Sequence, residues 1–190
     1  LAIKLLNSVK QFNHITVLGG PFAGFAPDRA INYSEVDIVC LGEGETAFLE
    51  LCKRLREKKD ISNIAGLWIK KQDGKIIKNS LGKLVDIKHL PPLDFDVFEE
   101  KRLHVMMRGK IYKMLPVETH RGCPYKCTFC GSPTDVEKYK NSELKQIFYR
   151  VFSLKKIQED LNYYIEKHRP EYIYFTADTF LSISKQELEE

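Results

Sequence analysis

The sequence predicts an α/β protein in which helices alternate with short strands, first in a parallel sheet and then at the start of a parallel barrel. Two observations support this prediction. In residues 1 to 60, helical apolar spacing alternates with short β-branched runs that end in glycine turns. From residue 114 onward, a strand, a long helix and a second strand follow one another, which is how a parallel barrel begins.

Composition indicates a globular protein without a membrane span. The chain has 190 residues, of which 43% are hydrophobic and 29% charged, and no apolar run approaches the roughly 20 residues that a spanning helix needs. The net charge of +4 is too small to indicate a nucleic-acid partner. Because the five cysteines are an odd number with three clustered, and no signal-peptide pattern is present, we expect a reducing, cytoplasmic compartment.

The first segment, residues 1 to 60, shows two strands that each run into glycines. Helical spacing of apolar residues predicts a helix over residues 1–10, and β-branched runs predict strands at 15–18 and 36–41. A further helix follows from residue 48. We expect Cys40 and Cys52, on apolar faces, to be core residues. In a parallel sheet, ligands bind over the carboxyl ends of the strands, where both glycine turns lie.

The connector, residues 61 to 113, combines a hairpin with a stiff linker. Asp73-Gly74 between two apolar runs predicts a β-hairpin, and the prolines of residues 90–96 predict an extended linker. We expect this segment to bridge two domains, 1–60 and 114–190. Five Lys and Arg residues between 101 and 113 form a basic stretch, for which a solvated face is favoured over phosphate contact.

Three cysteines lie on one short loop, spaced Cys-x3-Cys-x2-Cys at positions 123, 127 and 130. The spacing is that of a loop reaching three corners of a cubane iron–sulfur cluster, and Gly122 and Pro124 suit a tight turn. A strand over 114–119 delivers the loop. Two alternatives stay open: a zinc site that recruits His120, and three structural thiols.

The last segment continues with a βα pattern. Residues 133–142 are polar and poorly patterned, so we predict no regular element there. Ser153 is the expected N-cap of a helix over 154–168, which Pro170 stops. A strand at 172–175 then leads to Asp178. The chain also lacks a first methionine and starts and ends within predicted helices, so we expect a piece of a longer protein.

The cysteine loop, residues 122–131, resembles the signature of the radical S-adenosylmethionine (SAM) enzymes, with Phe129 at its aromatic position. The resemblance implies a [4Fe-4S] cluster on Cys123, Cys127 and Cys130, with SAM on the fourth iron and Phe129 near the adenine. It implies reductive cleavage of SAM to a 5′-deoxyadenosyl radical that removes hydrogen from a small-molecule substrate. An electron donor such as flavodoxin or ferredoxin is implied as well.

The strand before Asp178 is similar to the second strand of the radical SAM barrel, which often ends in Asp-Asp-x-Phe. Here Ala177 stands at the first aspartate position. Two interpretations of Asp178 stay open: it orients SAM or the substrate, or it caps the next turn.

The first segment resembles the second half of the cobalamin-binding domain found upstream of many radical SAM modules. The likeness covers about residues 1 to 58 and rests on Leu-Gly-Gly-Pro at 18–21 and on the run Val-Asp-Ile-Val-Cys-Leu-Gly-Glu-Gly-Glu at 36–45. It implies that two turns border the nucleotide tail of cobalamin, through Gly19, Gly20, Pro21, Gly42, Glu43 and Gly44. Since the first half of that domain is outside this chain, we expect the chain alone to bind cobalamin weakly or not at all.

Taken with this resemblance, the fold class is α/β: the rear half of a Rossmann-like cobalamin-binding domain, a hairpin and linker, and the first βα units of a partial TIM-type radical SAM barrel. The expected chemistry is methyl transfer with cobalamin, or cyclisation or rearrangement without it. The alternatives are a methylthiotransferase, which needs a second cysteine set that Cys40 and Cys52 do not form, and a non-catalytic zinc- or cobalamin-binding module.

Overall fold

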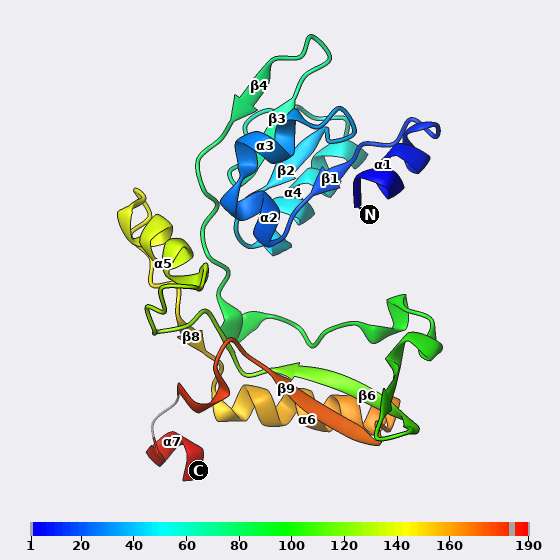
Figure 1. Ribbon diagram of the computed structural model, residues 1–190, viewed down its shortest axis with the longest axis vertical. Coiled ribbons are helices and arrows are strands. Elements are labelled where there is room, and N and C mark those ends of the chain that lie inside the picture. Colours follow the sequence, from blue (N-terminus) through cyan, green and yellow to red (C-terminus); the bar gives the residue numbers. More distant parts are fainter. Residues whose placement is uncertain (1, 183–184, 190) are drawn as a thin grey trace. The chain divides into compact units, whose positions relative to one another are not determined.

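The computed structural model describes residues 2–182 and 185–189. The chain divides into two compact units, and most of their elements are labelled in Figure 1. The first unit comprises Leu1–Val85 and Lys138–Gln146, and the second comprises Asp86–Glu137 and Ile147–Glu190. Among the described residues, no helix is both long enough and apolar enough to cross a membrane.

The first unit contains one sheet with the strand order β1-β2-β3-β4. Strands β1 (Val17–Leu18) and β2 (Ile38–Cys40) are parallel, as predicted. Strands β3 (Leu67–Lys70) and β4 (Ile76–Lys78) are antiparallel and form the predicted Asp-Gly hairpin. Because β3 also pairs with β2, the hairpin is part of this sheet rather than a separate bridge.

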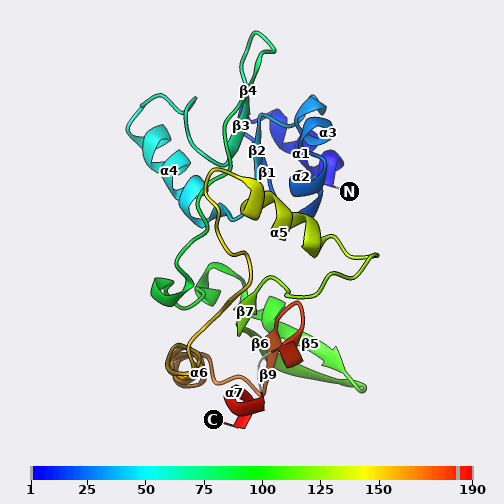
Figure 2. The ribbon, with the colours of Figure 1, turned by 90° about the vertical axis from the view of Figure 1, so that its left-hand side faces the viewer.

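Helices cover both faces of this sheet. Figure 2 shows α4 (Gly44–Arg56) on one face, and α1 (Ala2–Lys10), α2 (Pro21–Phe25) and α3 (Pro27–Asn32) on the other. Two apolar cores result because side chains alternate along β2: Ile38 packs in the cluster on the α4 side, and Val39 packs in the cluster with α2 and α3.

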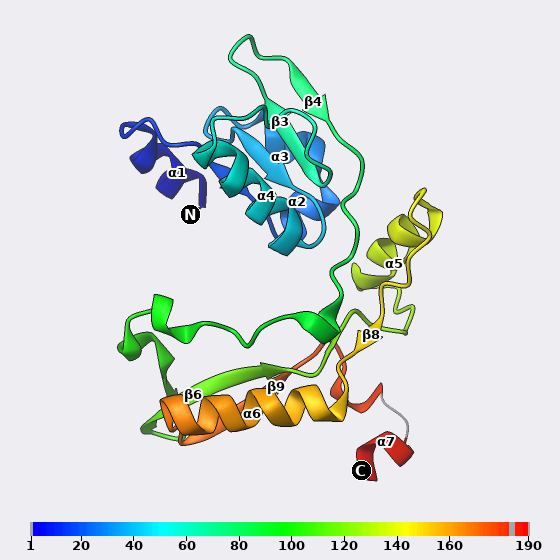
Figure 3. The ribbon, with the colours of Figure 1, turned by 180° about the vertical axis from the view of Figure 1, so that it is seen from behind.

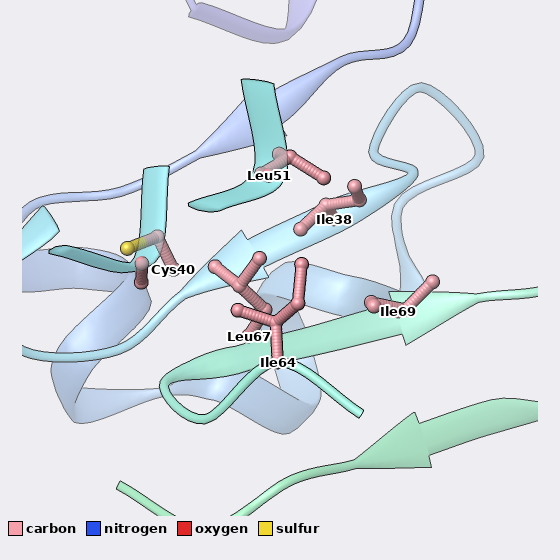
Figure 4. Packing of buried hydrophobic residues seen from close by; sticks show 7 residues of the cluster. Ile38, Cys40, Leu51, Ile64, Leu67 and Ile69 are labelled. Carbon is pink, nitrogen blue, oxygen red and sulfur yellow. The ribbon is translucent and has the colours of Figure 1, made fainter. Parts of the chain in front are cut away.

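The α4-side core includes one of the two cysteines predicted to be buried (Figure 4). Cys40 is buried there, and burial raises the pKa of its thiol, with the Glu45 carboxylate adding to the effect. The prediction for Cys52 is wrong, since its side chain is exposed. It follows the buried Leu51 by one position, and one helical step of about 100° turns it away from the core.

The second unit contains the parallel pair that the sequence predicts. Strand β5 (His104–Met107) is antiparallel to β6 (Lys110–Glu118), and β6 is parallel to β9 (Tyr172–Thr176). Helix α6 (Leu154–His168) joins β6 to β9 and lies along both strands (Figure 3). The core of the unit lies between helix and strands and is formed by Phe95, Leu115, Val117 and Tyr164.

One segment differs from the prediction, and a second, the basic stretch, forms an element that was not predicted from the sequence. Residues 133–142, expected to be irregular, lie almost entirely within helix α5 (Ser132–Asn141). The basic stretch forms a β-hairpin, because Arg108 and Gly109 take positive φ angles of 50° and 76° between β5 and β6. The remaining elements are short, namely β7 (His120–Arg121), β8 (Arg150–Val151), α7 (Lys185–Glu189) and 3₁₀ turns at Ile87–His89, Phe95–Val97, Glu100–Leu103 and Phe180–Ser182.

Candidate functional site

The two glycine turns of the first unit follow the parallel strands β1 and β2, so both lie at the carboxyl ends of these two strands. Gly20 has φ +84° and precedes α2, with Pro21 as the first helical residue. A Cβ atom on Gly20 would meet no atom within 4 Å. This turn therefore presents bare backbone to open space, as an approaching ligand requires.

The second turn is closed on one side. Gly42 has φ +71°, and a Cβ atom on it would overlap the hydroxyl of Tyr139, which is itself only 2% exposed. The Glu43 carboxylate accepts a hydrogen bond of 2.7 Å from the backbone N–H of Val85. Gly44 begins α4. Glu43 therefore ties this turn to the chain that leaves the hairpin.

A cavity of the first unit lies away from both glycine turns. It measures about 730 Å³ and is lined by residues that precede the two parallel strands, among them His14, Ile15 and Asp37, and by Lys70 and Asp73 of the hairpin. It is thus at the amino end of the strands. The glycine turns are not part of it.

In the second unit, β6 delivers the cysteine loop as predicted. Glu118 ends the strand, and its two carboxylate oxygens both accept from Nε of Arg121 at 3.0 Å. Gly122 is buried and has φ +80°, and a Cβ atom there would lie 2.8 Å from the Phe148 ring and 3.0 Å from the Phe148 carbonyl oxygen. This packing explains why glycine begins the loop.

The three cysteines of the loop are free thiols, with Cys123 partly exposed and Cys127 and Cys130 exposed. The N–H of Cys130 donates to the Cys127 carbonyl at 3.1 Å, and the N–H of Ser132 donates to Sγ of Cys130 at 3.4 Å. N–H···S contacts of this kind tune iron–sulfur clusters. Phe129 is 92% exposed.

The donor set of the loop fits an iron–sulfur cluster by its chemistry, because three accessible thiols occupy one short segment. Within residues 2–182 and 185–189, however, no three His, Cys, Asp or Glu side chains are grouped closely enough to hold a metal ion. His120, the fourth ligand of the zinc alternative, is 2% exposed and contacts Thr119 and the Tyr149 ring. The described residues therefore contain no Cys3His group.

Asp178 and the cysteine loop leave neighbouring strands at the same end of the sheet. Glu118 pairs in register with Thr176 of β9, and Asp178 follows two residues later with an exposed side chain. The carboxyl ends of parallel strands are where barrel enzymes place their chemistry.

Three residues important to the site geometry were not identified from the sequence, namely Arg121, Tyr139 and Phe148. Phe148 and Tyr139 pack against glycines that are distant in the chain, and no spacing rule links such pairs. For Arg121, the signal was present, since a carboxylate three residues before an arginine at a strand end can form an ion pair.

The relatives of this chain among known proteins include several methyltransferases. TokK, a cobalamin-dependent radical SAM methyltransferase of Streptomyces tokunonensis, is 32% identical over 143 residues, covering 70% of this chain and 20% of TokK. An uncharacterized methyltransferase of Pyrococcus horikoshii is 27% identical over 188 residues, covering 98% of this chain and 38% of that protein. No protein-family model matches the chain.

A solved structure shares the fold. OxsB, a cobalamin-dependent SAM radical enzyme with aqua-cobalamin and SAM bound, aligns over 98% of this chain and 24% of OxsB, with a TM-score of 0.65 and 21% identity. The chain thus spans only about a fifth to two fifths of the length of these proteins. The sequence relatives and the fold agree with the cysteine loop and with the two glycine turns. The chain belongs to the radical SAM enzymes that carry a cobalamin-binding domain.

Proposed function

We propose that the chain forms part of a radical SAM enzyme, with Cys123, Cys127 and Cys130 as the protein ligands of a [4Fe-4S] cluster. The observation that supports this most strongly is three free thiols, spaced Cys-x3-Cys-x2-Cys, on a loop at the carboxyl end of β6. When bound, such a cluster supplies one electron to SAM, which is cleaved to methionine and a 5′-deoxyadenosyl radical that removes hydrogen from the substrate.

Three residues in or near the cysteine loop are given roles by their positions in the second unit. Arg121, paired with Glu118, fixes the start of the loop to the end of β6. Phe129, with 92% of its surface exposed, is available to pack against the adenine of SAM. Asp178, at the same end of the sheet, orients SAM or the substrate.

The first unit is proposed to border the nucleotide tail of cobalamin through its glycine turns. Gly19, Gly20 and Pro21 form the open turn, and Gly42, Glu43 and Gly44 form the turn backed by Tyr139. TokK and the Pyrococcus protein are named as methyltransferases, and other relatives are named as cyclases, so methyl transfer to a small molecule is proposed ahead of cyclisation. We also propose that an electron donor of the flavodoxin or ferredoxin type reduces the cluster.

Metal content tests the proposal directly. After anaerobic reconstitution with iron and sulfide, the protein is expected to turn brown and hold about four irons per chain. Cys127→Ala removes one of only three thiolate ligands and is expected to abolish this cluster. Cys52→Ala is the matched control, because Cys52 is an exposed cysteine outside the loop. Zinc in place of iron, or a full cluster in Cys127→Ala, would refute the proposal.

A further inference from the structure

A short segment that follows the cysteine loop belongs to the first unit. This segment, residues 138–146, is called the strap below. Nζ of Lys138 donates to the Gly24 carbonyl at 2.8 Å and lies 4.8 Å from the centre of the Phe25 ring, both in α2. At the other end of the strap, the N–H of Leu84 donates to Oε1 of Gln146 at 2.9 Å.

Between these two contacts, the side chain of Tyr139 packs against the second glycine turn, at Gly42. A Cβ atom at Gly42 would overlap the Tyr139 hydroxyl and lie 3.3 Å from the ring carbon that carries it. Gly42 is nevertheless exposed, whereas Tyr139 is 2% exposed. The hydroxyl therefore covers only the Cβ side of the turn, and the other side of Gly42 stays accessible.

Two adjacent strap residues thus reach both turns of the proposed ligand site. Lys138 contacts α2, which begins directly after the open turn at Gly20, and Tyr139 contacts Gly42. Since both contacts are made from one helical turn of α5, they fix the position of one glycine turn relative to the other.

We propose that Tyr139 is a positioning residue for the ligand of the glycine turns: it holds the Gly42 turn in its positive-φ conformation and, with Lys138, sets the distance between the two turns. The inference rests on the proposed function, since the ligand in question is the nucleotide tail of cobalamin. Tyr139 itself is buried behind the turn and does not touch the ligand.

A double-variant cycle tests the positioning role in the whole protein, with hydroxocobalamin binding followed by absorbance. Gly42→Ala places a methyl group against the hydroxyl and is expected to weaken binding strongly. Tyr139→Phe removes that hydroxyl and keeps the ring. We expect Tyr139→Phe alone to weaken binding by about threefold. We expect the double variant to bind cobalamin more tightly than Gly42→Ala alone, by a factor of about three or more, because the two residues are in direct contact.

The control is Tyr163→Phe, which removes a hydroxyl bonded to Lys167 in the second unit and is expected to leave the Kd of cobalamin unchanged. If Tyr139 only stabilised the fold, Tyr139→Phe would lower the thermal stability, and its effect on the Kd of cobalamin would not depend on the substitution at Gly42. Independent effects of Gly42→Ala and Tyr139→Phe on the Kd would overturn the inference.

Hydrogen exchange separates failure of the inference from failure of the proposed function. In the protein without ligand, Tyr139→Phe is expected to speed amide exchange in residues 41–45, whereas Tyr163→Phe is not. Faster exchange in a protein that does not bind cobalamin would refute the proposed cobalamin function and leave Tyr139 as the residue that holds the turn. Unchanged exchange would refute the positioning role, whatever binds.

Discussion

At the scale of single residues, Gly122 controls how the chain enters the cysteine loop. Its φ of +80° disfavours any other residue, and the ring and carbonyl of Phe148 fill the space where a side chain would begin. Two independent effects therefore require glycine at this position, one from the backbone and one from packing.

We expect Gly122→Ala to lower the free energy of unfolding by about 2 to 4 kcal/mol, from positive-φ strain of about 1 to 2 kcal/mol plus the displacement of Phe148. Urea unfolding of the protein measures this. Gly109→Ala is the matched control, because Gly109 has φ +76° in the same unit and its Cβ atom would meet nothing within 4 Å. Equal losses in the two variants would show that the Phe148 contact is unimportant.

Sequence reasoning correctly placed segments whose local conformation is visible in their own spacing. The strand that leads into the cysteine loop and the two glycine turns after β1 and β2 lie where predicted, because short-range rules govern them. Cys52 was misplaced because its neighbour Leu51 takes the buried position of α4. Tyr139 was missed because its partner Gly42 is far away in the chain and only the tertiary structure brings the two together.

At the scale of elements, α6 shows how a local signal and a tertiary core agree. The side chain of Ser153 accepts from the N–H of Lys156 at 3.2 Å, and the helix ends at His168, where Arg169 takes a left-handed conformation. Tyr164 lies in the core, and its hydroxyl oxygen accepts a hydrogen bond of 2.6 Å from the N–H of Leu93 in the linker.

Ser153→Ala is expected to lower the free energy of unfolding by about 0.5 to 2 kcal/mol, since the first turn of α6 loses its cap. Chemical denaturation followed by circular dichroism gives the change. Lys155→Ala serves as control on the same turn, because Lys155 is 85% exposed and its contact with Glu159 is long, at 3.9 Å. An effect of Ser153→Ala no larger than that of the control would contradict the capping role.

The elements that sequence reasoning missed share one property. Helix α5 is mostly polar, with Tyr139 as its buried residue, and the strand β5 is largely exposed, so neither carries a clear apolar period. The hairpin β3–β4 was found from Asp73-Gly74, but its place in the sheet depends on the pairing of β3 with β2. Pairing between distant strands has no local signature.

At the scale of the whole molecule, the open turn at Gly20 makes the cobalamin proposal testable. We expect the 190-residue chain to bind hydroxocobalamin weakly or not at all and the whole protein to bind it. In the whole protein, Gly20→Val is expected to weaken binding by about tenfold or more, because the branched side chain enters the open space that we propose for the ligand. Absorbance titration measures both effects.

Gly74→Val is the matched control for this variant. Gly74 has φ +80°, close to the +84° of Gly20, and its Cβ atom would also meet nothing within 4 Å. The two substitutions therefore impose similar backbone strain, and only the one at Gly20 is expected to alter cobalamin binding. Tight binding by the 190-residue chain, or equal weakening by the two variants, would contradict the expectation.

The division of the first unit into two stretches of sequence has a consequence for synthesis. A ribosome releases residues 1–85 first, then the cysteine loop, and only afterwards residues 138–146. Until these last residues emerge, the nascent chain lacks the hydroxyl that backs Gly42 and the side chain that receives the N–H of Leu84. The first unit therefore completes its folding only once the three thiols of the cysteine loop are already outside the ribosome.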